Sequence, residues 1–107
     1  MSREWCLVAA CVLLAGCGEP AEESQTAHPG EQTYTRFCFS CHAAGIAGAP
    51  RTGDQDAWAS RVVKGDEALL QATLEGVPPG MPPRGLCSQC SDEDLAAAID
   101  YMIEKSL

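Results

Sequence analysis

The sequence is poor in basic side chains and has no long apolar run. Its 107 residues include 15 acidic and 7 basic ones, which gives a formal net charge of -8. This is the wrong sign for neutralising nucleic-acid phosphates or an anionic lipid surface, so neither is an expected partner. The longest apolar run has about eleven residues, whereas a membrane-spanning helix needs about 20. The length also excludes a large multidomain enzyme.

Large aromatic residues are scarce in the part of the chain that is expected to fold. Residues 30–107 hold two Phe, two Tyr and one Trp, and a core of that size is marginal by itself. Cysteine, by contrast, is abundant: seven cysteines are far too many for an ordinary reduced domain of this length. Small domains with this composition are stabilised by disulfides, a metal or a cofactor.

Residues 1–16 predict a bacterial lipoprotein signal peptide. The apolar run at 5–15 follows a polar start, and Leu14 to Cys17 resembles a lipobox, in which cleavage precedes the cysteine and that cysteine is lipidated. The alternative, a buried core helix, would not be followed directly by Gly and Pro. We therefore expect Cys17 to anchor a periplasm-facing protein to a bacterial membrane. Gly18, rather than Asp, after the cysteine favours the outer membrane.

Residues 17–29 predict a flexible acidic tether. From Gly18 onward this segment contains Glu, Ser, Gln, Thr, Pro and Ala but no large apolar residue, so it cannot bury surface that would offset the entropy of ordering. His28 lies in it and is expected to be a solvent-exposed linker histidine. The folded domain is then expected to span residues 30–107.

The helical signals predict an all-α domain of about four helices. Ser91 and Asp94 form a variant capping box, and the apolar residues that follow have the spacing of one buried helix face: Leu95, Ala98, Ile99, Met102 and Ile103. A second helix begins at Asp66 and ends before Gly76. A shorter turn is expected at 56–63 and a further helix at 30–39. No segment alternates long enough to predict a strand.

Cys38, Cys41 and His42 form a C-x-x-C-H sequence. Two thiols three positions apart on a helical turn face the same way, so both can add to the vinyl groups of one haem. His42 then reaches the iron from the same side as its fifth ligand. This predicts one covalently attached haem c per chain.

A second cysteine pair, Cys87 and Cys90, leaves a zinc site open as an alternative. Four thiolates can bind zinc, but 45 residues separate Cys41 from Cys87, against about 15 to 20 in the usual zinc pattern. An exported chain also meets an oxidising compartment, which favours a disulfide. A zinc or disulfide module without haem is therefore the minor interpretation.

Met81 is the best candidate for the sixth ligand of the iron. Met102 lies on the apolar face of the last helix, where packing explains it. Met81 instead sits in the loop Pro78-Pro79-Gly80-Met81-Pro82-Pro83, whose prolines fix the backbone and exclude a helix. A methionine thioether together with a histidine fills both axial positions of a haem iron.

The chain from Gly30 to Glu104 resembles class I c-type cytochromes, and within them the small bacterial cytochrome c5 group. The matching segments are Cys38 to His42, Gly45 to Pro50, Gly53-Asp54, Ala57-Trp58, Lys64-Gly65, Met81 to Gly85 and Cys87 to Asp94. The resemblance implies a small cytochrome fold in which helices wrap around one covalently bound haem. It also implies a crossing of the first and last helices, at which Gly30 and Tyr34 meet Tyr101.

The resemblance implies specific roles for the cysteines and for the iron ligands. Cys38 and Cys41 carry the thioethers, His42 and Met81 ligate the iron, and Cys87 and Cys90 form a disulfide. The carbonyl of Pro50 is expected to accept a hydrogen bond from Nδ1 of the axial histidine. Candidates to bond the haem propionates, which need donors when partly buried, are Trp58, Arg51, Arg61 and Arg84.

These observations predict an electron-transfer protein and not an enzyme. Two axial protein ligands leave no open position for a substrate and raise the reduction potential. The acidic surface is expected to favour periplasmic or membrane-bound redox partners with basic docking surfaces. The alternative is a haem-based sensor or peroxidase-like protein with a labile Met81, although the sequence offers no acid-base pair over the iron.

Overall fold

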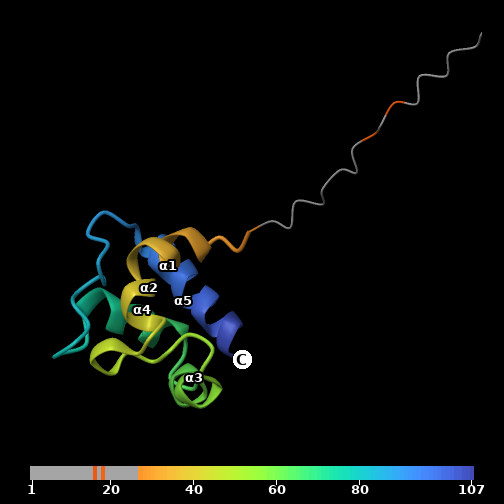
Figure 1. The fold of residues 1–107 in the computed structure, drawn as a ribbon. Coiled ribbons are helices and arrows are strands. Elements are labelled where there is room, and N and C mark those ends of the chain that lie inside the picture. The colour runs from red at the N-terminus through yellow and green to blue at the C-terminus, as the bar shows by residue number, and fades with distance from the viewer. Residues whose placement is uncertain (1–15, 17, 19–26) are drawn as a thin grey trace, which may run out of the picture.

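The computed structural model describes Gly16, Gly18 and residues 27–107. Most of the expected signal peptide, the expected lipidation site Cys17 and most of the expected tether lie outside the described residues. Figure 1 shows the helices of the described part gathered around the C-terminal one. They are α1 (Glu31–Phe37), α2 (Phe39–His42), the short 3-10 helix η1 (Ile46–Gly48), α3 (Gln55–Val62), α4 (Asp66–Glu75) and α5 (Asp92–Ser106). The expected all-α fold is confirmed.

α5 begins at the predicted capping box and forms the centre of the core. The Ser91 side chain accepts a hydrogen bond from the backbone N–H of Asp94 at 3.1 Å, and the Asp94 carboxylate accepts one from the N–H of Ser91 at 3.0 Å. These two bonds satisfy donors that a helix start leaves free. The buried face of α5 consists of Leu95, Ala98, Ile99, Met102 and Ser106.

α1 crosses α5 at very short range, as the resemblance implies. A Cβ atom on Gly30 would lie 1.8 Å from the carbonyl oxygen of Ala97, so only glycine permits this approach of the two backbones. One turn further on, the rings of Tyr34 and Tyr101 lie 5.0 Å apart between their centroids. The crossing therefore fixes the helix that precedes the cysteine pair against the core.

Residues 27–107 form five α-helices where about four were expected, because the first helical segment is broken. The expected helix at 30–39 ends after Phe37, and Cys38 adopts φ -118° and ψ -30° before α2 begins. The break separates the part that packs on α5 from the part that carries Cys41 and His42. Spacing of apolar residues does not reveal such a change of helix axis.

α3 and α4 follow the sequence signals closely. The expected turn at 56–63 is a helix of eight residues, capped by the Asp54 carboxylate, which accepts from the N–H of Ala57 at 3.0 Å. α4 begins at Asp66 and ends before Gly76, as predicted. Even α5, the longest described helix with 15 residues, is too short and too polar to cross a bilayer, and so are the other helices of residues 27–107.

The expectation that His28 is a solvent-exposed linker residue is wrong. Its side chain is 17% exposed, and its Nε2 lies 3.3 Å from the Glu104 carboxylate on α5. Its Nδ1 accepts a hydrogen bond from the N–H of Gly30 at 3.0 Å, and its ring lies edge-on to Tyr101. Packing against α5 therefore begins at least two residues before the expected boundary at Gly30.

Candidate cofactor site

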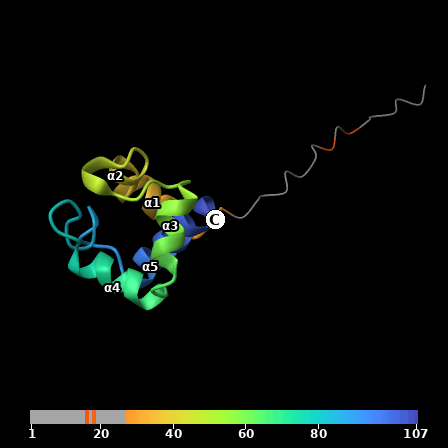
Figure 2. The same cartoon turned by 90° about the horizontal axis from the view of Figure 1, so that it is seen from below.

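A cavity of about 420 Å³ brings together the residues predicted to hold a haem. Cys38, Cys41 and His42 line it from the α1–α2 segment, Met81 from the loop after α4, and Met102 from α5. Figure 2 shows α2 and the loop after α4 opposite one another, with α5 closer to the centre of the domain. Residues of all three line the cavity. Segments about 40 residues apart in the sequence therefore face the same cavity.

His42 is buried, and its ring is held by one hydrogen bond. Its Nδ1 lies 2.8 Å from the carbonyl oxygen of Pro50. A carbonyl can only accept, so Nδ1 carries the proton and Nε2 keeps its lone pair. The Trp58 ring lies 6.2 Å from the imidazole between centroids. The ring is thus oriented with an unprotonated nitrogen available to a metal.

Cys38 and Cys41 are free thiols that both line the cavity. Burial, and to a smaller extent the neighbouring Cys41, raises the pKa of the Cys38 thiol to about 11. Before any covalent attachment this sulfur is therefore a protonated thiol at neutral pH. The α2 turn is closed by the N–H of His42, which donates to the carbonyl of Cys38 at 3.0 Å.

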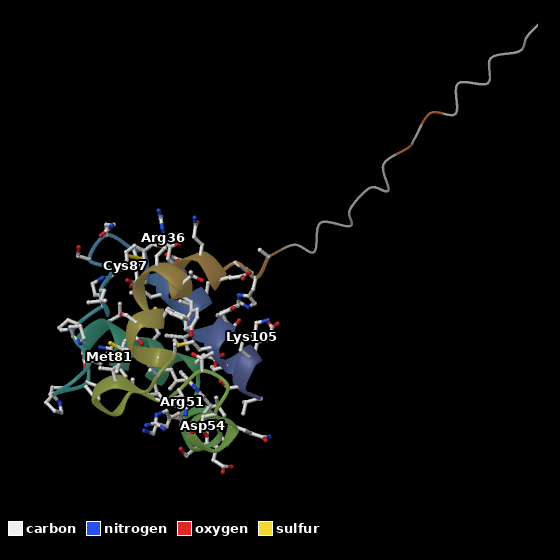
Figure 3. The ribbon with its side chains drawn as sticks, viewed as in Figure 1. Arg36, Arg51, Asp54, Met81, Cys87 and Lys105 are labelled. Atoms are coloured by element: carbon white, nitrogen blue, oxygen red, sulfur yellow. A yellow bond between two sulfur atoms is a disulfide. The ribbon has the colours of Figure 1, made fainter. Side chains whose placement is uncertain are left out.

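The loop that carries Met81 is closed by its own backbone. Val77 and Met81 exchange two backbone hydrogen bonds of 2.9 and 3.0 Å around a cis Pro78-Pro79 bond. A Cβ atom on Gly80 would lie 2.7 Å from the carbonyl oxygen of Ala47, so the loop packs directly on η1. Figure 3 shows Met81 on the side of the domain where these segments meet.

Cys87 and Cys90 form a disulfide in the structure, with their sulfurs 1.99 Å apart. This pairing removes two of the four thiols that a zinc site would need. Among the described residues, no group of three or more His, Cys, Asp or Glu side chains is arranged to hold a metal ion. The zinc alternative therefore has no donor set in this part of the chain.

Two of the four propionate candidates have other surroundings in the structure than the cavity alone. The Trp58 indole N–H donates to the backbone carbonyl of Arg51 at 2.9 Å, so this donor is already used. The Arg51 side chain is exposed and packs beside Gly45, and it is not among the described residues that line the cavity. Arg61 and Arg84 do line it.

Lys64 and Ser106 are polar residues of the site region to which the sequence analysis gave no role. Lys64 lines the cavity one helical turn after Arg61. The buried Ser106 hydroxyl accepts from the N–H of Gly53 at 2.9 Å and donates to the carbonyl of Met102 at 2.6 Å, which ties the end of α5 to the segment after Pro50. Ser106 could have been predicted from its position, because its spacing places it on the same face of α5 as the buried apolar residues.

The walls and the donor set of the cavity fit a covalently attached haem. Two free thiols lie beside an imidazole with a free lone pair, and a thioether comes from a separate loop. Histidine and methionine are the axial ligands found in c-type cytochromes. The lining is largely apolar, and among the described residues that form it there is no Asp or Glu. Its only charged side chains are Arg61, Lys64 and Arg84.

Comparison with known proteins identifies the family. Residues 25–102 match the family model described as cytochrome C oxidase, cbb3-type, subunit III. Cytochrome c5 of Azotobacter vinelandii is 41% identical over 78 residues, which cover 71% of this chain and 93% of that protein. Cytochrome c-555 of Chlorobaculum tepidum is 32% identical over 103 residues, which cover 94% of this chain and 92% of that protein.

Solved structures agree with these relatives. A structure titled as an electron transfer complex of nitrite reductase with cytochrome c contains a chain with 40% identity and a TM-score of 0.70, covering 74% of this chain and 95% of that one. A mono-heme ferrocytochrome c from Shewanella putrefaciens has 38% identity and a TM-score of 0.64, covering 73% and 94%. The chain thus belongs to the class I c-type cytochromes of the cytochrome c5 family, monohaem electron carriers and not enzymes.

Proposed function

We propose that this chain holds one haem c through thioethers to Cys38 and Cys41, with His42 and Met81 as the axial ligands. The observation that carries the proposal is that all four side chains line one largely apolar cavity. When bound, the haem supplies an iron that gains and loses single electrons. The protein's part is to hold both axial groups in place and to keep water and other ligands away.

Each axial residue has a distinct task in this proposal. Pro50 fixes the tautomer of His42, so its Nε2 needs no rearrangement to bind the iron. The closed Val77–Met81 loop presents the thioether from a segment that packs on η1. With both positions occupied by protein, the iron changes oxidation state without exchanging ligands, as an electron carrier requires.

The absorption spectrum of the oxidised and reduced holoprotein tests this assignment. We expect c-type bands, together with the weak far-red band of ferric iron bound by methionine. The variant Met81→Leu is expected to lose the far-red band. Met102→Leu, a matched change in the same cavity, is expected to keep it. Loss of the band in Met102→Leu and retention in Met81→Leu would reverse the assignment.

We propose that Cys17 is lipidated after removal of residues 1–16 and that the domain faces the periplasm, with the outer membrane favoured. The support is the lipobox-like sequence and the Gly that follows Cys17. Expression in a bacterium that attaches haem c should place the native protein in the membrane fraction. Cys17→Ala should abolish this, whereas Cys11→Ala should not. Equal partitioning of the native protein and Cys17→Ala would contradict the anchor.

We propose that the redox partner offers a basic docking surface. The support is the formal net charge of -8, which attracts a partner of opposite charge at long range. The second-order rate of electron transfer with such a partner should fall as ionic strength rises. A rate that stays constant between low and physiological salt would contradict electrostatic steering.

A further inference from the structure

The loop that carries Met81 has almost no means of polar attachment. Of the ten residues from Gly76 to Gly85, only Arg84 has a polar side chain; the others are glycine, proline, valine and methionine. Any hydrogen bond that a side chain of this loop makes to the rest of the domain must therefore come from Arg84.

Arg84 makes contacts with two separate parts of the domain. Its guanidinium Nη2 donates to the carbonyl oxygen of Cys90 at 2.7 Å and to the Asp92 carboxylate at 3.1 Å. Its backbone N–H donates to the carbonyl of Thr73 on α4 at 2.7 Å. The first two contacts join the loop to the disulfide and to the first turn of α5, and the third joins it to α4.

The backbone of Arg84 is also in an unfavourable conformation. Its φ is 61°, in the left-handed region that residues other than glycine rarely adopt. Such a conformation persists where surrounding contacts determine it, and it is concentrated near functional groups. Here the contacts to Thr73, Cys90 and Asp92 are the ones that hold it.

We propose that Arg84 is the positioning residue for Met81: it ties the ligand loop to the Cys90–Asp92 segment and thereby keeps the methionine sulfur at the iron. This inference rests on the proposed ligation by Met81. The side chain itself is not a ligand; it acts three residues away by limiting how far the loop can move out of the cavity. Loss of the tie should make Met81 easier to displace.

Imidazole binding to the ferric holoprotein measures this displacement directly, because imidazole must replace Met81 and the far-red band disappears as it does. Hydrogen bonds from the charged Arg84 side chain stabilise the position of the loop, and Arg84→Met removes them. This variant should therefore bind imidazole about tenfold more tightly than the native protein. Arg84→Lys keeps the charge but not the fork of donors, so it should lie between the two. Asp92→Asn leaves the Cys90 contact and should have a smaller effect.

Arg36→Met is the matched control, since Arg36 is exposed on α1 and does not line the cavity. The imidazole affinity of this variant should equal the native one.

An imidazole affinity of Arg84→Met within twofold of native would overturn the proposal. So would lower urea stability without a change in imidazole affinity, because that is a purely structural role. If Arg84→Met yields no holoprotein, Arg84→Lys decides: an imidazole affinity within twofold of native would overturn the proposal. A native protein without the far-red band would instead refute the ligation by Met81 itself.

Discussion

Thr52 shows how a single buried atom affects the stability of the site region. It follows Arg51, and its backbone N–H donates to the carbonyl of His42 at 2.7 Å. Its hydroxyl oxygen is buried and has no hydrogen-bond partner among the described residues. An unsatisfied buried hydroxyl costs about 1–3 kcal/mol. Thr52 therefore holds His42 by its backbone, while its hydroxyl adds no hydrogen bond among the described residues.

We expect Thr52→Val to raise the free energy of unfolding of the holoprotein by about 1 kcal/mol, since valine has the same shape without the hydroxyl. Urea unfolding measures this. Thr35→Val, at an exposed position of α1, should change it by less than about 0.5 kcal/mol. A loss of stability in Thr52→Val would show that the hydroxyl bonds a haem propionate or a water in the loaded protein.

At the scale of the elements, the helices with local end signals were predictable and the others were not. α5 carries its capping box in the sequence, and α4 is bounded by Asp66 and Gly76. The break at Cys38 and the packing of His28 on α5 have no local signal. The packing of His28 depends on contacts with Tyr101 and Glu104, more than 70 residues away in the sequence. Composition alone therefore assigned His28 to the tether.

The crossing of α1 and α5 provides a prediction at this scale. Gly30→Ala places a Cβ 1.8 Å from the Ala97 carbonyl oxygen, so the two helices must move apart. We expect a loss of about 3 kcal/mol in the free energy of unfolding. Gly48→Ala is the comparison: it has open space but φ +81°, and it should cost about 1 kcal/mol from the backbone alone. Equal losses in both would show that the crossing adjusts without strain.

At the scale of the whole molecule, the haem cavity takes up much of a small domain. An empty cavity of about 420 Å³ corresponds to a loss of about 10 kcal/mol, and the entire stability of a domain is about 5–15 kcal/mol. The core cluster of five buried residues, four of which line the cavity, does not replace this contribution. The folded state therefore depends on the group that fills the cavity.

We expect the double variant Cys38→Ala, Cys41→Ala, which cannot form thioethers, to lose cooperative thermal unfolding once free haem is removed. Circular dichroism across a temperature ramp measures this, with the native holoprotein as reference. The Cys87–Cys90 disulfide stays intact in both proteins, so it does not contribute to the difference. A sharp transition and full helical signal in the haem-free variant would contradict the expectation.

Some residues of the site could be predicted from the sequence and others could not. The C-x-x-C-H sequence and the proline-rich Met81 loop predicted four residues that the fold brings to one cavity. They were predictable because each motif can be recognised from neighbouring residues in the sequence. The charged lining was only partly predictable. Whether Arg51 faces the cavity depends on the path of the loop between α2 and α3, and whether Arg61 and Lys64 do depends on the placement of α3. No local pattern describes either.

The signs of the charges around the cavity also bias the direction of electron flow. Arg61, Lys64 and Arg84 line the cavity, and no carboxylate does so among the described residues. Arg84 is paired with the Asp92 carboxylate, which leaves Arg61 and Lys64. Loss of an electron by a haem bound here would add a positive charge, which these two cations and a wall of low polarity would disfavour. The lining thus stabilises the electron-rich form. Such a centre takes electrons readily and delivers them only to a stronger oxidant.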